Sequence, residues 1–221
     1  MDWLVLQLGD SAFPAGGFAH SAGLEAAAQL GQLRGEGAVA SFVRDALWQA
    51  GYGSLPLVGE AHASHNPARL AELDALCDAF LTGEVANRAS RTQGRALLAA
   101  SAGSFDDPAL ARLNDCVRGR RLRGHHAPLF GAIVATLGVA RHDALALWMH
   151  GALRGILSAA VRLGLAGAHE AQGLQRQTAP LLDRVLAECG ALPVEALAQT
   201  SPRIEITGSQ HARLYARLFQ S

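Results

Sequence analysis

Apolar residues recur at a helical spacing along most of the chain. Between residues 39 and 47, for example, one stripe collects Val39, Phe42, Val43, Ala46 and Leu47. This spacing of i, i+3, i+4, i+7 and i+8 places the side chains on one face of an α-helix. Alanine and leucine supply 78 of the 221 residues, which favours helix over strand. The pattern predicts one all-α domain over residues 1–221, a bundle of about eight to ten helices.

Glycine, proline and capping residues divide this pattern into segments. Ser21 is the expected N-cap of a helix over residues 22–30, and the helix that starts near residue 39 should end before Gly51 and Gly53. Short helices are expected at residues 56–65, and longer ones at 67–80, 84–100, 106–117, 129–139, 143–165 and 170–188. Pro180 should kink or divide the last of these. Residues 204–206 alternate as in a strand but are too few to define a sheet, and residues 209–219 predict a final amphipathic helix.

The charged residues exclude several chemistries. All 19 basic residues are arginine, and they balance 19 acidic residues. A Walker-A loop and Schiff-base catalysis both need a lysine, so neither is expected here. Zero net charge gives no reason to expect nucleic acid as the main partner. The Arg118 to Arg123 segment has four arginines without interleaved aromatics, which favours a solvated loop or an acidic partner over nucleic acid.

Cysteine usage and hydropathy bear on the compartment. Cys77, Cys116 and Cys189 are odd in number and widely spaced, so no disulfide framework is expected and a reducing cytoplasm is predicted. No positively charged region follows Met1, and charge-free runs such as 127–140 stop at 14 residues. Neither secretion nor membrane insertion is therefore expected.

Histidine and serine raise two further hypotheses. His62 and His65 stand at i, i+3, but no Cys, Asp or Glu completes a metal-ligand set nearby. A transient nickel or zinc contact at an interface and a stand-alone metal-binding helical protein stay open. A small hydrolase would use His20 and Ser21 with Glu25, yet no G-x-S-x-G elbow surrounds the serine. The residues favour a helix cap with a first-turn carboxylate, and no catalytic, metal or cofactor-binding residue is predicted.

Two segments concentrate the residue types that anchor interfaces. The loop over residues 16–21 carries Phe18 and His20 just before a helix, and residues 213–219 carry Tyr215 and Phe219 together with two arginines at i, i+4. Aromatic residues and arginine are enriched at the centres of protein interfaces. We therefore expect the N-terminal loop (about 9–21) and the C-terminal tail (about 203–221) to dock, either on the chain's own core or on another chain.

These two segments also carry a family resemblance. Residues 6–8 and 10–25, which include Asp10-Ser11-Ala12-Phe13-Pro14-Ala15-Gly16-Gly17-Phe18-Ala19-His20-Ser21, resemble the opening signature of the UreF family, urease accessory protein F. Residues 210–221 resemble the closing motif of that family. Residues 88–95, 126–131 and 158–164 match further family motifs in order. The resemblance covers essentially the whole chain.

The resemblance implies an all-α, dimeric, non-catalytic protein of the cytoplasm that helps to assemble the urease metallocentre. Its implied partners are a nickel-carrying GTPase similar to UreG, a scaffold similar to UreD or UreH, and apo-urease. The chain would hold no cofactor of its own, because the accessory complex handles nickel and GTP.

The resemblance also assigns roles to individual residues. Glu25 and Arg162 match positions implicated in engaging the GTPase, and Phe18, Tyr215 and Arg217 match positions that support binding to the scaffold. The candidate partner-binding residues are Phe18, His20, Glu25, Arg162, Tyr215, Arg217 and Phe219.

Overall fold

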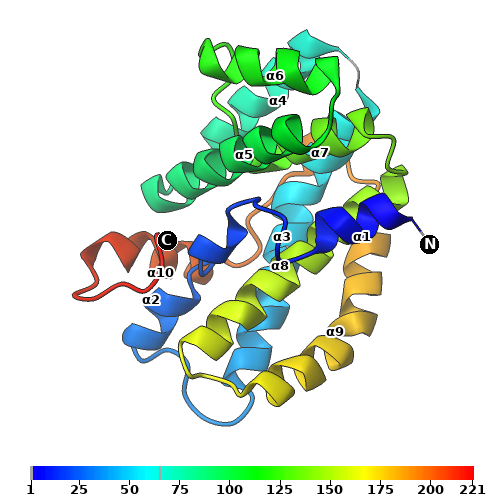
Figure 1. The fold of residues 1–221 in the computed structure, drawn as a ribbon. Coiled ribbons are helices and arrows are strands. Elements are labelled where there is room, and N and C mark those ends of the chain that lie inside the picture. Colours follow the sequence, from blue (N-terminus) through cyan, green and yellow to red (C-terminus); the bar gives the residue numbers. More distant parts are fainter. Residues whose placement is uncertain (1, 65) are drawn as a thin grey trace.

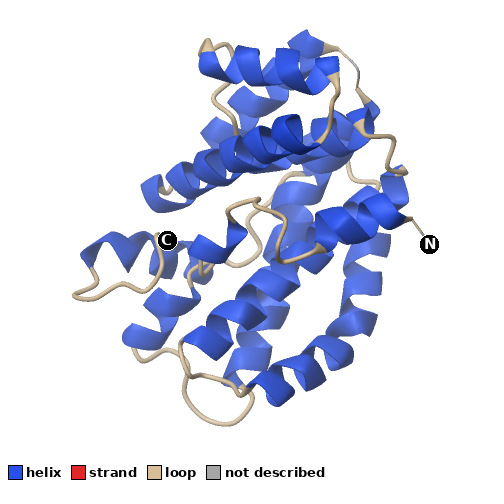
Figure 2. Cartoon of the chain, viewed as in Figure 1, coloured by secondary structure: helices blue, strands red, loops and turns tan. Residues whose placement is uncertain are grey.

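The fold is entirely helical in the computed structural model, which describes residues 2–64 and 66–221. Within these ranges there are ten α-helices, three short 3-10 helices and no strand (Figures 1 and 2). The α-helices are α1 (Trp3–Gly9), α2 (Leu24–Gln29), α3 (Ala38–Ala63), α4 (Pro67–Phe80), α5 (Glu84–Ser104), α6 (Pro108–Arg118), α7 (His126–Thr136), α8 (Arg141–Arg162), α9 (Ala168–Cys189) and α10 (Pro202–Ser209). The 3-10 helices are η1 (Gly17–Ala19), η2 (Val194–Ala196) and η3 (Gln210–Arg213). The predicted all-α class is confirmed.

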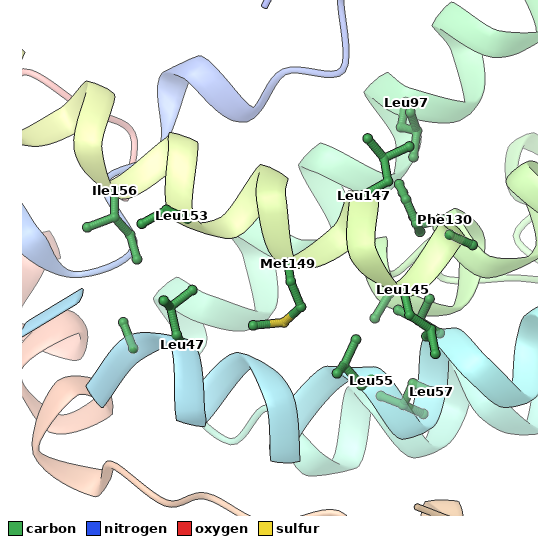
Figure 3. Close-up of a cluster of buried hydrophobic side chains, with 14 of the residues drawn as sticks. Leu47, Leu55, Leu57, Leu97, Phe130, Leu145, Leu147, Met149, Leu153 and Ile156 are labelled. Carbon is green, nitrogen blue, oxygen red and sulfur yellow. The ribbon is translucent and has the colours of Figure 1, made fainter. Parts of the chain in front are cut away.

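Helix α3 forms the centre of the molecule. It contacts α7, α8 and α9 along its length, and Figure 1 shows α4 to α7 grouped around one of its ends. Figure 3 shows the apolar side chains at the crossing of α3 with α8, where Leu47 and Leu55 face Met149 and Leu153. All four are fully buried. Each such side chain stabilises the fold by about 1.5–3 kcal/mol through its removal from water.

The predicted break of α3 at Gly51 and Gly53 is wrong. Helix α3 continues through both glycines and through Pro56 as one element. A Cβ atom at Gly51 would collide with Val185 of α9, so this glycine permits a close helix crossing. Pro56 has no N–H for the carbonyl of Tyr52, and the N–H of Ala198 donates to that carbonyl instead (3.3 Å). Tertiary contacts therefore offset both local helix breakers.

Three other boundary predictions are also corrected. Helix α9 runs undivided through Pro180, which is exposed, so water can solvate the carbonyl that proline leaves without a donor. The strand-like residues 204–206 lie inside α10, which begins with Pro202 at its first turn. The expected final helix over 209–219 is limited to η3, and residues 214–221 form turns and loop.

Helix α8 is the apolar helix that bears on the expectation of no membrane insertion. By length and composition alone it is long and apolar enough to cross a membrane, although it carries scattered charges. Half of its most apolar stretch is buried inside the protein, against α3 and α9. Its hydropathy is accounted for by its place in the core, as Figure 3 shows for Met149, Leu153 and Ile156.

Candidate functional site

The two predicted interaction segments lie against each other. The backbone N–H of Gln220 donates to the carbonyl of Ala19 (2.8 Å), and the N–H of Ser21 donates to the carbonyl of Ser221 (2.6 Å). The hydroxyl of Ser21 donates to the same carbonyl (2.9 Å). The docked tail, which comprises residues 214–221, therefore adds backbone hydrogen bonds to the loop that follows η1. Figure 1 shows the C-terminus beside α2 and α10.

Ser21 is consequently not the N-cap of α2. The helix begins at Leu24, after Gly23 in the left-handed region at φ 85°, and Gly23 provides no side-chain cap. The predicted cap is wrong because the hydroxyl of Ser21 serves the docked tail instead. Its remaining contact with the N–H of Glu25 is long, at 3.5 Å.

Glu25 anchors the docked tail from the first turn of α2. Its carboxylate accepts hydrogen bonds from the N–H groups of Leu218 (2.6 Å) and Phe219 (3.2 Å) and from Nε2 of His211 (2.8 Å). The Glu25 and His211 side chains are 2% and 1% exposed. A carboxylate this deeply buried requires such partners, and the position at a helix N-terminus adds favourable dipole interactions. Glu25 therefore holds the tail in place rather than facing solvent.

Histidines surround this anchor without forming a metal site. Nδ1 of His20 lies within hydrogen-bond distance of the Ser221 hydroxyl. The pKa of His20 is lowered by burial and then by the nearby His211. Burial and the charge of His20 lower the pKa of His126 to about 4. Over residues 2–64 and 66–221, no three His, Cys, Asp or Glu side chains gather in a way that could hold a metal ion.

The structure also bears on the predicted metal contact at His62 and His65 and on the hydrolase hypothesis. His62 contacts the carbonyl of Val139 through Nε2 (2.8 Å), while its proposed companion His65 lies outside the described residues. His20 and Ser21 both contact Ser221 rather than each other. The hydrolase hypothesis therefore lacks the hydrogen bond between nucleophile and base that it requires.

Arg162 joins three separate parts of the chain. Its guanidinium lies 3.8 Å from the ring centroid of Phe18 and 4.2 Å from that of Phe219. Nη1 also donates to the carbonyl of Phe18 (2.6 Å). A cation between two aromatic faces contributes about 1 kcal/mol or more for each well-placed ring. The end of α8 thus holds the N-terminal loop and the docked tail together.

The outer side of this arrangement presents apolar and aromatic groups. Tyr215 is fully exposed, Phe18 is 69% exposed and Leu218 is 53% exposed. Arg217 is also exposed, whereas Phe219 is buried. We call the exposed set of Phe18, Tyr215, Arg217 and Leu218 the tail surface. A cavity of about 80 Å³ beside His20, Gln220 and Ser221 is too small for a drug-sized substrate, and a larger one of about 640 Å³ lies between α2, α3 and α10. The tail surface lines neither cavity, and its exposed aromatic and apolar groups suit protein binding.

Two residues that hold the docked tail were not predicted from the sequence. His211 pairs with Glu25 across 186 positions, and Gln29 donates to the carbonyl of Ala216 (2.8 Å) across 187. No periodicity or spacing links residues so far apart. The only available signal was the position of His211 inside the closing motif.

A second buried carboxylate and histidine cluster lies between α4, α5 and α7. Asp74 accepts hydrogen bonds from the N–H groups of Arg123, Gly124 and His125. His125 is fully buried, with Nε2 3.0 Å from Asp78 and Nδ1 3.1 Å from the hydroxyl of Ser90. We call these residues the helix-core cluster.

The electrostatics of this cluster fit a structural role. The pKa of Asp78 is lowered chiefly by the hydrogen bond from His125, while burial lowers the pKa of His125. With His125 neutral, Nε2–H donates to Asp78 and the hydroxyl of Ser90 donates to Nδ1. The connectivity resembles a Ser-His-Asp triad, but the imidazole has no exposed surface. It therefore joins three helices and reaches no substrate.

Comparison with known proteins gives a consistent result. The family model described as UreF matches residues 33–179, more than half of the chain. Urease accessory protein F of Oryza sativa subsp. indica is 38% identical over 98% of this chain and 84% of its own length. Urease accessory protein F of Arabidopsis thaliana is 34% identical over 100% and 93%, and urease accessory protein UreF of Trichodesmium erythraeum is 31% identical over 97% and 94%.

Proposed function

The chain belongs to the UreF family of urease accessory proteins, and we propose that it acts in urease maturation by binding other proteins through the tail surface. The general role of the family is the maturation of urease, and its members are accessory rather than catalytic proteins.

One observation carries the proposal: a fully exposed Tyr215 stands on a backbone that Glu25 fixes from inside the protein. Large exposed side chains on a mobile segment would lose conformational entropy upon binding. The hydrogen bonds to Glu25 order this segment beforehand. Exposed tyrosine and arginine beside apolar side chains are typical of interface hot spots.

The seven candidate residues divide into two roles in this proposal. Phe18, Tyr215 and Arg217 would contact a partner, because all three are exposed. Glu25 and His20 are buried, so we infer that they affect binding by positioning the tail. Arg162 and Phe219 belong to the positioning group as well, since they stack on each other.

The proposed partners are a scaffold similar to UreD or UreH, a GTPase similar to UreG, and apo-urease. In this scheme nickel and GTP are handled by the complex, with nickel as cargo, and this chain works as a homodimer in the cytoplasm. The absence of lysine supports the division of labour, because nucleotide chemistry of the Walker-A type needs a lysine that this chain lacks.

Co-purification with the scaffold and the GTPase tests the proposal. We expect Tyr215→Ala, and deletion of residues 209–221, to reduce recovery of the complex and activation of urease at least about 10-fold, the usual effect of a hot-spot residue. Trp3→Ala is the matched control, because Trp3 is a 77% exposed aromatic on α1, far from the tail in Figure 1. Equal recovery of all variants would contradict the proposal.

A further inference from the structure

Positive charge is concentrated in one part of a chain whose net charge is zero. Residues 84–124 contain eight of the 19 arginines and only four acidic residues, a net charge of +4. The rest of the chain therefore carries −4. Such a separation of charge creates a positive surface even though the whole molecule is neutral.

The fold brings these arginines together from two elements. Nε and Nη2 of Arg95 on α5 donate to the carbonyl of Arg123 (3.2 and 2.9 Å). The N–H groups of Arg121 and Leu122 donate to the carbonyl of Cys116, which turns the segment back onto the end of α6. We call residues 118–123 the arginine loop. In Figure 1 it connects α6 to α7 on the side of α5 away from α2 and α10.

The arginine loop is fixed at its base. Asp74 binds the backbone N–H of Arg123 and Gly124, and Arg123 pairs with Asp78 (3.1 Å). Arg118, Arg120 and Arg121 are exposed and, over the described part of the chain, lie within 4.0 Å of no carboxylate. Arg95 is exposed and likewise has no carboxylate partner within the described ranges. Four guanidinium groups thus remain without a counter-charge on an anchored backbone.

We propose that the arginine loop, together with Arg95, is a docking surface for a protein segment rich in aspartate and glutamate. Planar guanidinium groups match carboxylates in two-point hydrogen bonds. The loop contains no aromatic residue on which a nucleic acid base could stack. This inference is independent of the tail surface and of the role in urease maturation.

Binding of a labelled oligoglutamate peptide tests the inference. The test variant is Arg118→Gln with Arg120→Asn and Arg121→Gln, where asparagine suits the positive φ of 58° at position 120. The matched control is Arg176→Gln with Arg184→Gln and Arg203→Gln, three exposed arginines on α9 and α10. Both variants change the net charge by the same amount. Circular dichroism establishes that each remains folded.

We expect the loop variant to weaken peptide binding at least about 10-fold at about 0.1 M salt while the control stays within about 2-fold, because charge attraction then extends over only about 10 Å. A single-stranded oligonucleotide of equal charge should bind more weakly than the peptide. Equal weakening by both variants would show that net charge alone matters and would overturn the proposal. Tighter binding of the oligonucleotide, or no peptide binding by the unaltered protein, would overturn it as well.

Discussion

Two buried carboxylates hold irregular backbone in this protein, and they do so in different surroundings. Asp74 binds three consecutive N–H groups of residues 123–125, and Glu25 binds those of Leu218 and Phe219. Asp74 lies among the long helices α4, α5 and α7, whereas Glu25 lies on α2, a helix of six residues. Both carboxylates accept hydrogen bonds from backbone N–H groups, but the helices that surround them differ in length and packing.

This difference indicates which of the two regions, the helix-core cluster or the Glu25 anchor, can unfold locally without the rest of the domain. Local opening is favoured where few apolar contacts have to break, and core elements open only with the whole domain. Asp74 lies on α4 between the core residues Leu73 and Cys77, and the docked tail contributes Phe219 as its only buried large apolar side chain. We therefore expect the helix-core cluster to determine global stability and the Glu25 anchor to determine the order of the tail.

The largest expected effect comes from Asp74→Ala. The change leaves three backbone N–H groups without their acceptor inside the protein, and each costs about 1–3 kcal/mol when unsatisfied. We expect the free energy of unfolding to fall by about 3 kcal/mol or more in urea titration. The control is Asp115→Ala, an exposed carboxylate on α6. A loss no larger than that of the control would show that water replaces the carboxylate.

The next effect comes from Glu25→Ala. We expect hydrogen exchange of the Leu218, Phe219 and Gln220 amides to accelerate by at least about 10-fold, while the free energy of global unfolding falls by only about 1–2 kcal/mol. Glu36→Ala, an exposed carboxylate near the start of α3, is the control. If amides in α3 and α8 accelerate as much as those of the tail, the two clusters are one cooperative unit.

The contrast also explains what the sequence could predict. The helix-core region depends on short-range signals: the structure has Pro67 and Pro108 at the starts of α4 and α6, and the side chains of Asn66 and Asp107 cap these helices. The prediction for the tail region fails because the residues that hold the tail in place are far apart in the sequence. Ser21 has the residue type of a cap but binds Ser221, about 200 positions away.

The break predicted at Gly51 fails for a related reason. Local propensity disfavours glycine within a helix, but the close approach of α9 requires it there. Among the site residues, residue type alone selected Phe18 and Tyr215 as interface anchors, and both are exposed in the structure. The burial of Glu25 could not be inferred, because an isolated carboxylate in a first helical turn is usually solvated.

The dependence of stability on pH provides a further test, through the buried imidazole of His126. The pKa of His126 is about 4 in the folded protein, below the ordinary 6.5, because of burial first and His20 second. The unfolded chain therefore binds the proton more readily between these two values. Stability is fully present above pH 6.5 and falls as the pH decreases toward 4, by up to about 1.4 kcal/mol per pH unit for one group.

Replacement of His126 isolates this contribution. His126 packs on Trp148 with a ring-centroid distance of 4.7 Å, so His126→Phe keeps an aromatic ring and removes the titration. We expect the slope of unfolding free energy against pH to become shallower between 6.5 and 4. Chemical denaturation at several pH values measures it. An unchanged slope would assign the acid sensitivity to His20, His125 and His150, whose pKa values are also lowered by burial.

The smallest expected effect is that of Arg162→Lys, which separates charge from shape at the tail. Lysine keeps the positive charge but loses the planar group that lies between Phe18 and Phe219. We expect the tail amides to lose about 0.5–1 kcal/mol of protection in hydrogen exchange, with global stability unchanged. Arg176→Lys on the exposed side of α9 provides the control. Full protection in Arg162→Lys would mean that Glu25 alone orders the tail, and larger losses that extend into α8 would mean that the tail belongs to the core.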